Sequence, residues 1–339
     1  MGAKECIRTA IAFSIGCFLS IFVLIRMVIV ILKSRGRVSW KRHDMPDCLR
    51  DPALGTHNYA HLEHVRLHYV AAGDEDKPLM LMIHGFPEFW FSWRYQIKEF
   101  KKYYRVVAID QRGYSESDAP SGVNSYNVGE LANDIKQLVP ALGYKSCVLV
   151  GHDWGGAAAW TVAGLYPELV EKLIIMNCPH PLSFRKYVAT HMAQFKKSWY
   201  MFFFYVPLLP ELYFCMRDRK MLEVALTSSV MGVHCTKLSP DEIKAYKFAF
   251  PTLGSFTGPI NYIRAITRTM PPRQKKISAP TLLIWGCKDG ALERGLAPLA
   301  EKYTDSLTIK YVEDASHWVQ MDCPDVVNAH MRDFLNIAS

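Results

Sequence analysis

Short apolar runs that alternate with helical stretches are the feature that most constrains how this chain folds. Seven runs have the length and composition of buried strands, and they span residues 65–71, 79–84, 106–109, 147–151, 173–176, 281–285 and 307–311. Four longer stretches have helical spacing, at residues 131–142, 157–166, 292–303 and 326–335. Alternating strands and helices form a mostly parallel sheet with helices on both faces, so we predict an α/β fold.

The alternation is interrupted between residues 183 and 272, where aromatic and Met residues are frequent and no strand is evident. The densest part, residues 198–205, is too short to be a second membrane span. We interpret the region as a helical cap over the carboxyl ends of the strands, where such sheets bind ligands. The predicted organisation is an anchor at 1–33, a linker at 34–60, a core at 61–182 and 273–339, and the cap at 183–272.

The N-terminal segment is apolar over the length of a membrane span. No charged residue occurs from Thr9 to Ile25, and the apolar run continues to Leu32 after Arg26. Such a run suits a bilayer-spanning helix and exceeds the apolar part of a cleaved signal peptide. Arg26 stands near the end of the run, from which its side chain can reach the membrane surface. We predict a single-pass anchor through residues 9–32.

The positive charge of the chain is concentrated next to this anchor. Residues 1–50 carry nine Lys and Arg against three acidic residues, whereas the other 289 residues carry 31 basic and 29 acidic groups. A nucleic-acid partner is therefore not expected. More basic residues follow the apolar run than precede it, which favours a cytosolic catalytic part, with the endoplasmic reticulum as one candidate membrane.

The nine cysteines lack metal-ligand spacing and are interpreted as reduced structural thiols.

One turn has the pattern of a nucleophile elbow. The strand at 147–151 runs into Gly151-His152-Asp153-Trp154-Gly155-Gly156, with Asp153 where Ser is usual. Small residues are needed beside the nucleophile because the turn is tight and strained. A carboxylate suits attack on a saturated carbon that carries a leaving group, and the resulting ester must then be hydrolysed. The alternative, that Asp153 merely caps a helix, explains the flanking glycines less well.

Further strand ends supply the expected partners of Asp153. Asp289 follows the strand at 281–285, and His317 follows the strand at 307–311. His317 would activate water while Asp289 orients the imidazole; Asp314 is a rival for Asp289 but stands too close to His317 in sequence. An oxyanion hole needs two backbone N–H groups, which we assign to Trp154 and Phe86.

Taken together, these residues resemble the epoxide hydrolases of the α/β-hydrolase superfamily, and with the anchor they resemble its membrane-anchored members. The resemblance covers roughly residues 50–335 and is carried by His84–Glu88, Trp93-Arg94, Asp110–Ser115, Gly151–Gly156 and Ala315–Trp318. It implies an α/β-hydrolase fold and the conversion of an epoxide into a vicinal diol through an ester on Asp153. It requires no metal and no organic cofactor.

The resemblance also implies two cap tyrosines that hold and protonate the epoxide oxygen. Tyr200, in Ser198-Trp199-Tyr200, matches the first. The family pattern for the second is Asn-x-Tyr-Arg, but this chain reads Asn261-Tyr262-Ile263-Arg264. One helical residue turns a side chain by about 100°, so the pattern leaves open whether Tyr262 reaches the site, whether Tyr200 acts alone, or whether activity is weak.

Two other functions compete with epoxide hydrolysis. Haloalkane dehalogenases share the Asp elbow with a following Trp, but their pattern resembles His-Gly-Asn-Pro, and Phe86 here replaces the halide-binding Asn. A catalytically inactive membrane protein of the same fold is favoured only by Ile263. The aromatic cap and the anchor favour an apolar, lipid-derived epoxide as the small-molecule substrate.

Overall fold

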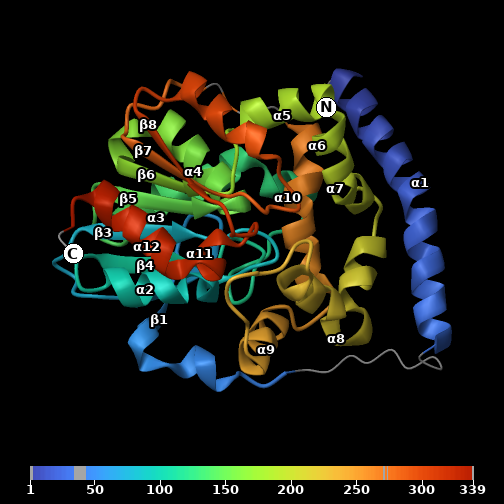
Figure 1. Ribbon diagram of the computed structural model, residues 1–339, viewed down its shortest axis with the longest axis horizontal. Coiled ribbons are helices and arrows are strands. Elements are labelled where there is room, and N and C mark those ends of the chain that lie inside the picture. Colours follow the sequence, from blue (N-terminus) through green and yellow to red (C-terminus); the bar gives the residue numbers. More distant parts are fainter. Residues whose placement is uncertain (1–2, 34–42, 270–271, 273, 338–339) are drawn as a thin grey trace.

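The computed structural model describes residues 3–33, 43–269, 272 and 274–337 (Figure 1). An eight-stranded sheet with the order β1-β2-β4-β3-β5-β6-β7-β8 forms its centre. Strand β2 runs antiparallel to both of its neighbours, and the other neighbouring pairs are parallel. The strands are β1 (Thr56–His61), β2 (Arg66–Ala72), β3 (Leu79–Ile83), β4 (Arg105–Ile109), β5 (Cys147–His152), β6 (Val170–Met176), β7 (Thr281–Gly286) and β8 (Leu307–Val312). The predicted, mostly parallel sheet is confirmed.

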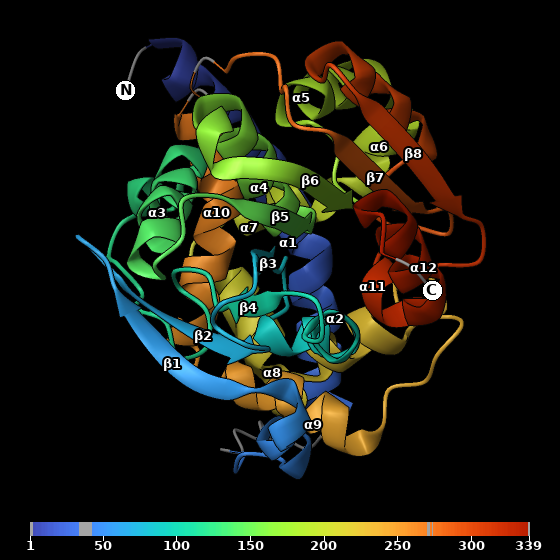
Figure 2. The same ribbon diagram turned by 90° about the vertical axis from the view of Figure 1, so that its left-hand side faces the viewer.

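Alternate residues of the central strands pack into two apolar layers. Met80 and Met82 of β3 join the layer under α2, α11 and α12, whereas Leu79 and Leu81 join the layer under α3 and α4. Figure 2 shows the twisted sheet between α3 and the group of α2, α11 and α12. Strands buried on both faces read as continuous apolar runs, which explains why they are visible in the sequence. These helices are α2 (Arg94–Phe100), α3 (Val128–Ala141), α4 (Asp153–Leu165), α11 (Val319–Asp322) and α12 (Pro324–Leu335).

Within the described residues, six α-helices and the short η6 are inserted between β6 and β7, and α6, α7 and α10 lie between the sheet and helix α1 (Figure 1). The predicted helical cap at 183–272 corresponds to this insertion, whose first helix begins slightly earlier. A break at Met216–Arg219 divides α8, because three consecutive residues there have positive φ. The helices are α5 (Pro181–Thr190), α6 (Met192–Lys197), α7 (Trp199–Phe204), α8 (Leu209–Thr227), α9 (Pro240–Ala249) and α10 (Thr257–Arg268).

The N-terminal helix α1 (Ala3–Lys33) packs along the cap, against α7 and α10 (Figure 1). Its buried side includes the small residues Ala12, Gly16 and Ser20. A Cβ on Gly16 would lie 2.2 Å from the carbonyl oxygen of Phe202, so only glycine permits this approach. The opposite side exposes large apolar side chains, and the segment Cys6–Leu32 is long and apolar enough to cross a membrane.

Two elements differ from the sequence-based expectation. The predicted linker at 34–60 contains strand β1, of which only Ala60 is buried, so its polar sequence gave no strand signal; residues 34–42 lie outside the described part. The stretch expected to be an α-helix at 292–303 is a 3-10 helix, η7 (Arg294–Tyr303), with Pro298 inside it. Proline lacks the N–H that an α-helix needs there.

The other 3-10 helices are η1 (Asp47–Arg50), η2 (Pro52–Leu54), η3 (Trp90–Trp93), η4 (Val123–Tyr126), η5 (Pro167–Leu169) and η6 (Gly254–Phe256).

Candidate active site

Asp153 stands at the sharp turn between β5 and α4, with a left-handed φ of 49°. This strained conformation is rare outside glycine and is retained only where the surroundings enforce it. The flanking glycines are required by close contacts. A Cβ on Gly151 would lie 2.5 Å from the Gly155 carbonyl oxygen, and one on Gly155 would lie 2.1 Å from the Ile83 carbonyl oxygen. The sequence therefore folds this turn so that the Asp153 carboxylate faces the cap.

The structure brings the three predicted residues of the triad together. Nδ1 of His317 lies 2.7 Å from Oδ2 of Asp289, and Nε2 lies 3.5 Å from Oδ2 of Asp153. Oδ1 of Asp289 accepts hydrogen bonds from the backbone N–H groups of Ala291 and Leu292, at 2.7 and 2.9 Å. Both ring nitrogens of His317 thus face carboxylates that are held by the core.

The charges of these groups stabilise one another. Burial disfavours the carboxylate of Asp153, but the hydrogen bond and charge of His317 outweigh burial and hold the pKa of Asp153 below its usual value. The pKa of Asp289 is also lowered, because His317 again outweighs burial. Burial disfavours the imidazolium, yet the two carboxylates raise the pKa of His317 well above its usual value. These opposite shifts favour an ionised Asp153 beside a protonated His317.

The loop after β3 supplies a backbone donor to Asp153. The Phe86 N–H donates to Oδ1 of Asp153 at 2.9 Å. The neighbouring Gly85 N–H donates to Oε2 of Glu88 at 2.9 Å, which holds the loop in place. A Cβ on Gly85 would lie 2.5 Å from the Cβ of Asp153, so the loop can approach the nucleophile only with glycine there. Trp154, the second predicted oxyanion residue, directly follows Asp153 and lines the same cavity.

A cavity of about 120 Å³ opens above Asp153, between the core and the cap. Aromatic and aliphatic side chains make up most of its wall. The core contributes the nucleophile turn and the end of β6, whereas the cap contributes α5, α7 and α10. Its lining includes Asp153, Trp154, Asn177, Phe184, Tyr200 and Tyr262.

Tyr200 lines this cavity from α7 and is only partly buried. Burial and the negative charges of Asp153 and Asp289 raise the pKa of Tyr200. The hydroxyl therefore stays protonated at neutral pH. Within the described ranges, no side chain or backbone group makes a hydrogen bond with it, so its proton is available to a bound ligand.

Tyr262 lines the same cavity but engages its hydroxyl elsewhere. Helix α10 presents Tyr262, Ala265 and Ile266 to the cavity, which are spaced as one helical face, and Thr269 follows at its C-terminal end. The Tyr262 hydroxyl donates to the carbonyl oxygen of Arg112 at 2.8 Å. Ile263, at the position of the family's second tyrosine, is buried in the apolar core. The ring of Tyr262 thus forms part of the cavity wall, while its hydroxyl proton points to the backbone carbonyl of Arg112.

A buried ion pair behind the nucleophile was not foreseen from the sequence. Nδ1 of His152 lies 2.6 Å from Oε2 of Glu88, and its Nε2 lies 2.9 Å from the His317 carbonyl oxygen. Gln320 donates to the other oxygen of Glu88 at 2.9 Å. These contacts connect the loop after β3, the nucleophile turn and the His317 loop. Glu88 and His152 each belong to a motif that is visible in the sequence, but no spacing between the two motifs indicates that these side chains contact each other.

Asp322 and Asn177 are two further residues that sequence reasoning missed. Asp322 is fully buried and accepts backbone hydrogen bonds from Ser316 on one side and from His234 and Cys235 of the cap on the other. It therefore connects the cap to the loop that carries His317. Asn177 donates from Nδ2 to Oδ2 of Asp289 at 2.7 Å and so helps to orient that carboxylate.

Comparisons with known proteins identify the family. A family model described as alpha/beta hydrolase fold matches residues 78–324. The human protein named Epoxide hydrolase 4 is 46% identical over 299 residues, which cover 87% of this chain and 83% of that protein. This chain belongs to the epoxide hydrolases. Epoxide hydrolase 1 of Caenorhabditis elegans is likewise 46% identical over 308 residues, covering 90% of this chain and 76% of that protein.

Solved structures of epoxide hydrolases have the same architecture. A mutant epoxide hydrolase from Bacillus megaterium, complexed with its product, superposes with a TM-score of 0.76 at 34% identity. The match covers 82% of this chain and all of that enzyme. The resemblance noted in the sequence and the α/β-hydrolase fold are therefore confirmed, and epoxide hydrolysis is the activity supported by these relatives.

Proposed function

We propose that this enzyme opens epoxides through a covalent ester on Asp153 and releases vicinal diols. One observation carries the proposal: Asp153 lies in the cavity between a backbone donor and His317, while Tyr200 offers an unused hydroxyl to the same cavity. Phe86 occupies Oδ1 of Asp153, which leaves Oδ2 for attack on an epoxide carbon. As that carbon–oxygen bond breaks, Tyr200 donates its proton to the ring oxygen. The products of this step are an alkyl ester, a new hydroxyl and a Tyr200 phenolate.

Ester formation changes the charge that surrounds His317. Before the attack two carboxylates favour its protonated form; afterwards the Asp153 ester is neutral and Asp289 remains. The pKa of His317 falls as a consequence. At the same time the phenolate needs a proton. Transfer of the His317 proton to Tyr200, through solvent in the cavity, restores the tyrosine and leaves a neutral imidazole that can act as a base.

Hydrolysis of the ester completes the cycle. Neutral His317 removes a proton from water as the oxygen attacks the ester carbonyl carbon, and Asp289 stabilises the imidazolium that forms. The N–H groups of Phe86 and Trp154 stabilise the oxyanion. Cleavage of the bond between the carbonyl carbon and the alcohol oxygen releases the diol, which takes up the proton from His317. The resulting Asp153 carboxylic acid then gives its proton to His317, which restores the starting charges. The net reaction is epoxide plus water giving diol.

Tyr262 has a secondary part in this proposal. Its hydroxyl can contact an epoxide oxygen only after exchanging its hydrogen bond with Arg112. Burial raises the pKa of Tyr262 well above its usual value, so it also stays protonated. Tyr200 is therefore the proposed acid, and Tyr262 contributes an aromatic part of the cavity wall.

The cavity wall favours an apolar epoxide. Phe184, Met201 and Ile266 contribute apolar surface around Asp153 and Tyr200, and burial of such surface is the main source of affinity for an apolar ligand. The Bacillus megaterium enzyme was solved with a naphthyloxy-propane-diol, a vicinal diol with an aromatic substituent. We extend that substrate chemistry to this chain, including epoxides derived from lipids.

We further propose that α1 anchors the enzyme in a membrane as a single pass, with the catalytic part in the cytosol. The apolar segment Cys6–Leu32 has sufficient length, and its outward side exposes Ile7, Phe18, Phe22 and Leu32. Crossing the bilayer with the catalytic part in the cytosol requires α1 to leave α7 and α10, which it contacts in the structure. Basic residues are more numerous after the helix than before it. The endoplasmic reticulum is a candidate location for an enzyme that acts on epoxides dissolved in lipid.

The deciding experiment offers fatty-acid and styrene-type epoxides to the purified full chain in detergent and measures diol formation. Asp153→Ala tests the nucleophile, and Asp314→Asn is the matched control because Asp314 is an exposed carboxylate paired with Lys288. Diol from the wild type and the control, but not from Asp153→Ala, supports the mechanism. Mass spectrometry of His317→Gln should show an alkyl ester on Asp153. Diol formation that persists in Asp153→Ala would contradict the covalent route.

A further inference from the structure

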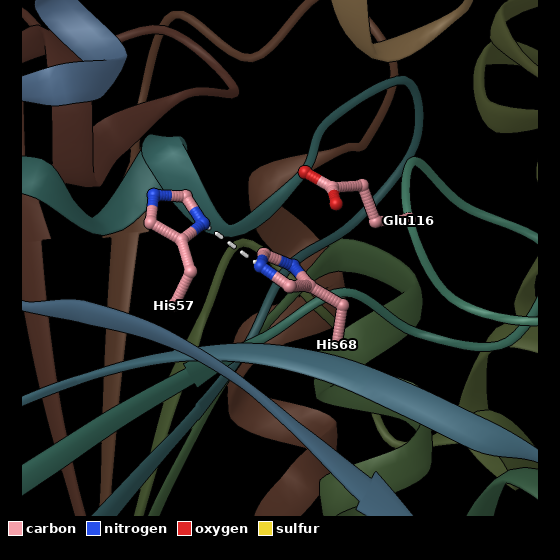
Figure 3. A group of neighbouring side chains, drawn as sticks. All are labelled: His57, His68 and Glu116. Carbon is pink, nitrogen blue, oxygen red and sulfur yellow. Dashed lines mark hydrogen bonds between the residues drawn. The ribbon is translucent and has the colours of Figure 1, made fainter.

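A group of three metal-ligating side chains lies at the edge of the sheet, outside the catalytic cavity. His57 of β1, His68 of β2 and Glu116 of the loop after β4 place one potential ligand atom each within 4.8 Å of one another. Figure 3 shows the two imidazoles joined by a hydrogen bond, with the Glu116 carboxylate turned toward them. We propose that these residues bind one Zn²⁺, with water completing the coordination.

Strand register places the two histidines together. Tyr59 and His68 are directly opposite each other in the antiparallel pair of β1 and β2. His57 is two residues from Tyr59 and therefore projects from the same face of the strand. As a result Nδ1 of His57 lies 2.9 Å from Nε2 of His68. The hydrogen bond between these nitrogens occupies the place where a shared cation would lie.

The buried histidine is already oriented as a zinc ligand. Nδ1 of His68 donates to Oδ2 of Asp110 at 2.8 Å, and both side chains are fully buried. Oδ1 of the same carboxylate accepts the Trp90 N–H at 2.9 Å. Zinc-binding histidines generally donate their second ring N–H to a carboxylate, which fixes the tautomer and the ring orientation. The lone pair of His68 Nε2 is thereby directed at His57.

Glu116 is held close enough to serve as the third ligand. The Tyr59 hydroxyl donates to its Oε2 at 2.5 Å, which keeps the carboxylate beside the imidazoles. Two histidines and one glutamate form a known donor set for Zn²⁺, with nitrogen and oxygen ligands at about 2.0–2.2 Å. Tetrahedral coordination separates ligand atoms by roughly 3.3 Å. The partly exposed Glu116 side chain must move by about 1.5 Å at most, since the three ligand atoms already lie within 4.8 Å.

Zinc bound by these residues would link strand β1 to the loop that follows β4. In that loop Ser117 bonds both the backbone N–H of His68 and the carbonyl oxygen of Asp110. The loop also contains Arg112, whose carbonyl oxygen holds the hydroxyl of Tyr262 in the cavity wall. Metal binding therefore stabilises an edge strand and one support of the epoxide cavity, without contributing a ligand to the reaction.

The test uses the full chain without a polyhistidine tag, purified in detergent and stripped of metal with a chelator. Calorimetric titration with Zn²⁺ measures the stoichiometry and affinity, and titration with Co²⁺ reports tetrahedral coordination by its visible absorption. His57→Gln and Glu116→Gln remove one ligand each at residues that are not buried. His61→Gln is the matched control, because His61 is an exposed histidine at the end of the same strand.

We expect about one Zn²⁺ per chain for the wild type and for His61→Gln, together with a rise in the thermal unfolding midpoint. His57→Gln and Glu116→Gln should weaken binding at least about tenfold, a loss typical of an impaired zinc site. Equal unfolding midpoints of all variants without metal show that they are folded. Absence of binding by the wild type overturns the proposal. So does unchanged binding by His57→Gln, which would assign the metal to another cluster, such as Cys235, Asp322 and Cys323.

Discussion

The amide nitrogen of Phe86 lies 2.9 Å from Oδ1 of Asp153, so the two oxygens of this carboxylate have different surroundings. Oδ1 is fixed by the backbone, and Oδ2 faces His317 at 3.5 Å. The fixed oxygen becomes the carbonyl oxygen of the ester if Oδ2 attacks the substrate. The donor that orients the carboxylate in the resting enzyme is then already in place to stabilise the oxyanion during hydrolysis.

The two half-reactions should depend differently on pH. The pKa of Asp153 is below its usual value because His317 outweighs burial, so the nucleophile is ionised throughout the neutral range. The rate of ester formation should therefore be constant from about pH 6 to pH 8, well above the ordinary Asp pKa of about 3.9. Ester hydrolysis requires neutral His317, so its rate should fall as the pH falls through the pKa of His317 in the ester. Rapid-quench mass spectrometry should find more ester at lower pH, and an unchanging ester fraction would contradict the assignment of His317 as the base.

The two cap tyrosines should differ in their effect on rate. Tyr200→Phe removes the proton donor and should lower kcat about 100-fold or more. Tyr262→Phe should change kcat much less, because its hydroxyl is bonded to Arg112. It should instead reduce the free energy of unfolding by about 1–2 kcal/mol, the cost of leaving a buried carbonyl without its donor. Steady-state kinetics and urea denaturation separate the two effects, and equal losses of kcat would require Tyr262 to act as an acid.

Replacement of Glu88 tests the buried ion pair behind the nucleophile. In Glu88→Gln the side-chain amide would face N–H donors from Gly85 and Gln320, while His152 loses its charged partner. Loss of one member of a buried pair costs about 3–5 kcal/mol, so we expect a clearly lower unfolding midpoint. Glu99→Gln is the control, because the ion pair of Glu99 with Arg332 is partly exposed and contributes about 1 kcal/mol or less. Similar midpoints for the two variants would argue against a structural role of the pair.

The packing of α1 on the cap can be tested at its closest contact. Gly16→Leu introduces a side chain where a Cβ alone would meet the Phe202 carbonyl oxygen at 2.2 Å. We expect the helix to separate from α7 and the unfolding midpoint to decrease. Phe18→Leu is the control, since Phe18 is 62% exposed on the outward side of α1. Differential scanning fluorimetry in one detergent compares the two variants; a Gly16→Leu midpoint equal to the wild type would mean that this contact contributes little to stability.

The buried strands were predictable from the sequence, whereas partnerships between distant side chains were not. Asp153, Asp289 and His317 each follow an apolar strand, and strands of one parallel sheet end at the same edge, so their proximity could be inferred. Strand β1 was not predicted, because a mostly exposed edge strand lacks the apolar pattern by which strands are recognised in a sequence. The pairing of Glu88 with His152 joins residues 64 positions apart, and no periodicity encodes such a contact. The direction of the Tyr262 hydroxyl also depends on tertiary packing, because the helical pattern fixes only the face that the ring occupies.

The contact between α1 and helices α7 and α10 has a mechanical consequence. Those two helices carry Tyr200 and Tyr262 on the side that lines the cavity, so α1 supports the same wall from outside. A helix that crosses a bilayer is surrounded by lipid, so insertion of α1 would remove this support and allow the spacing between Tyr200 and Asp153 to change. Membrane insertion would thereby become a variable of the reaction, and turnover of the full chain with and without bilayers should differ even when the dissolved substrate is the same.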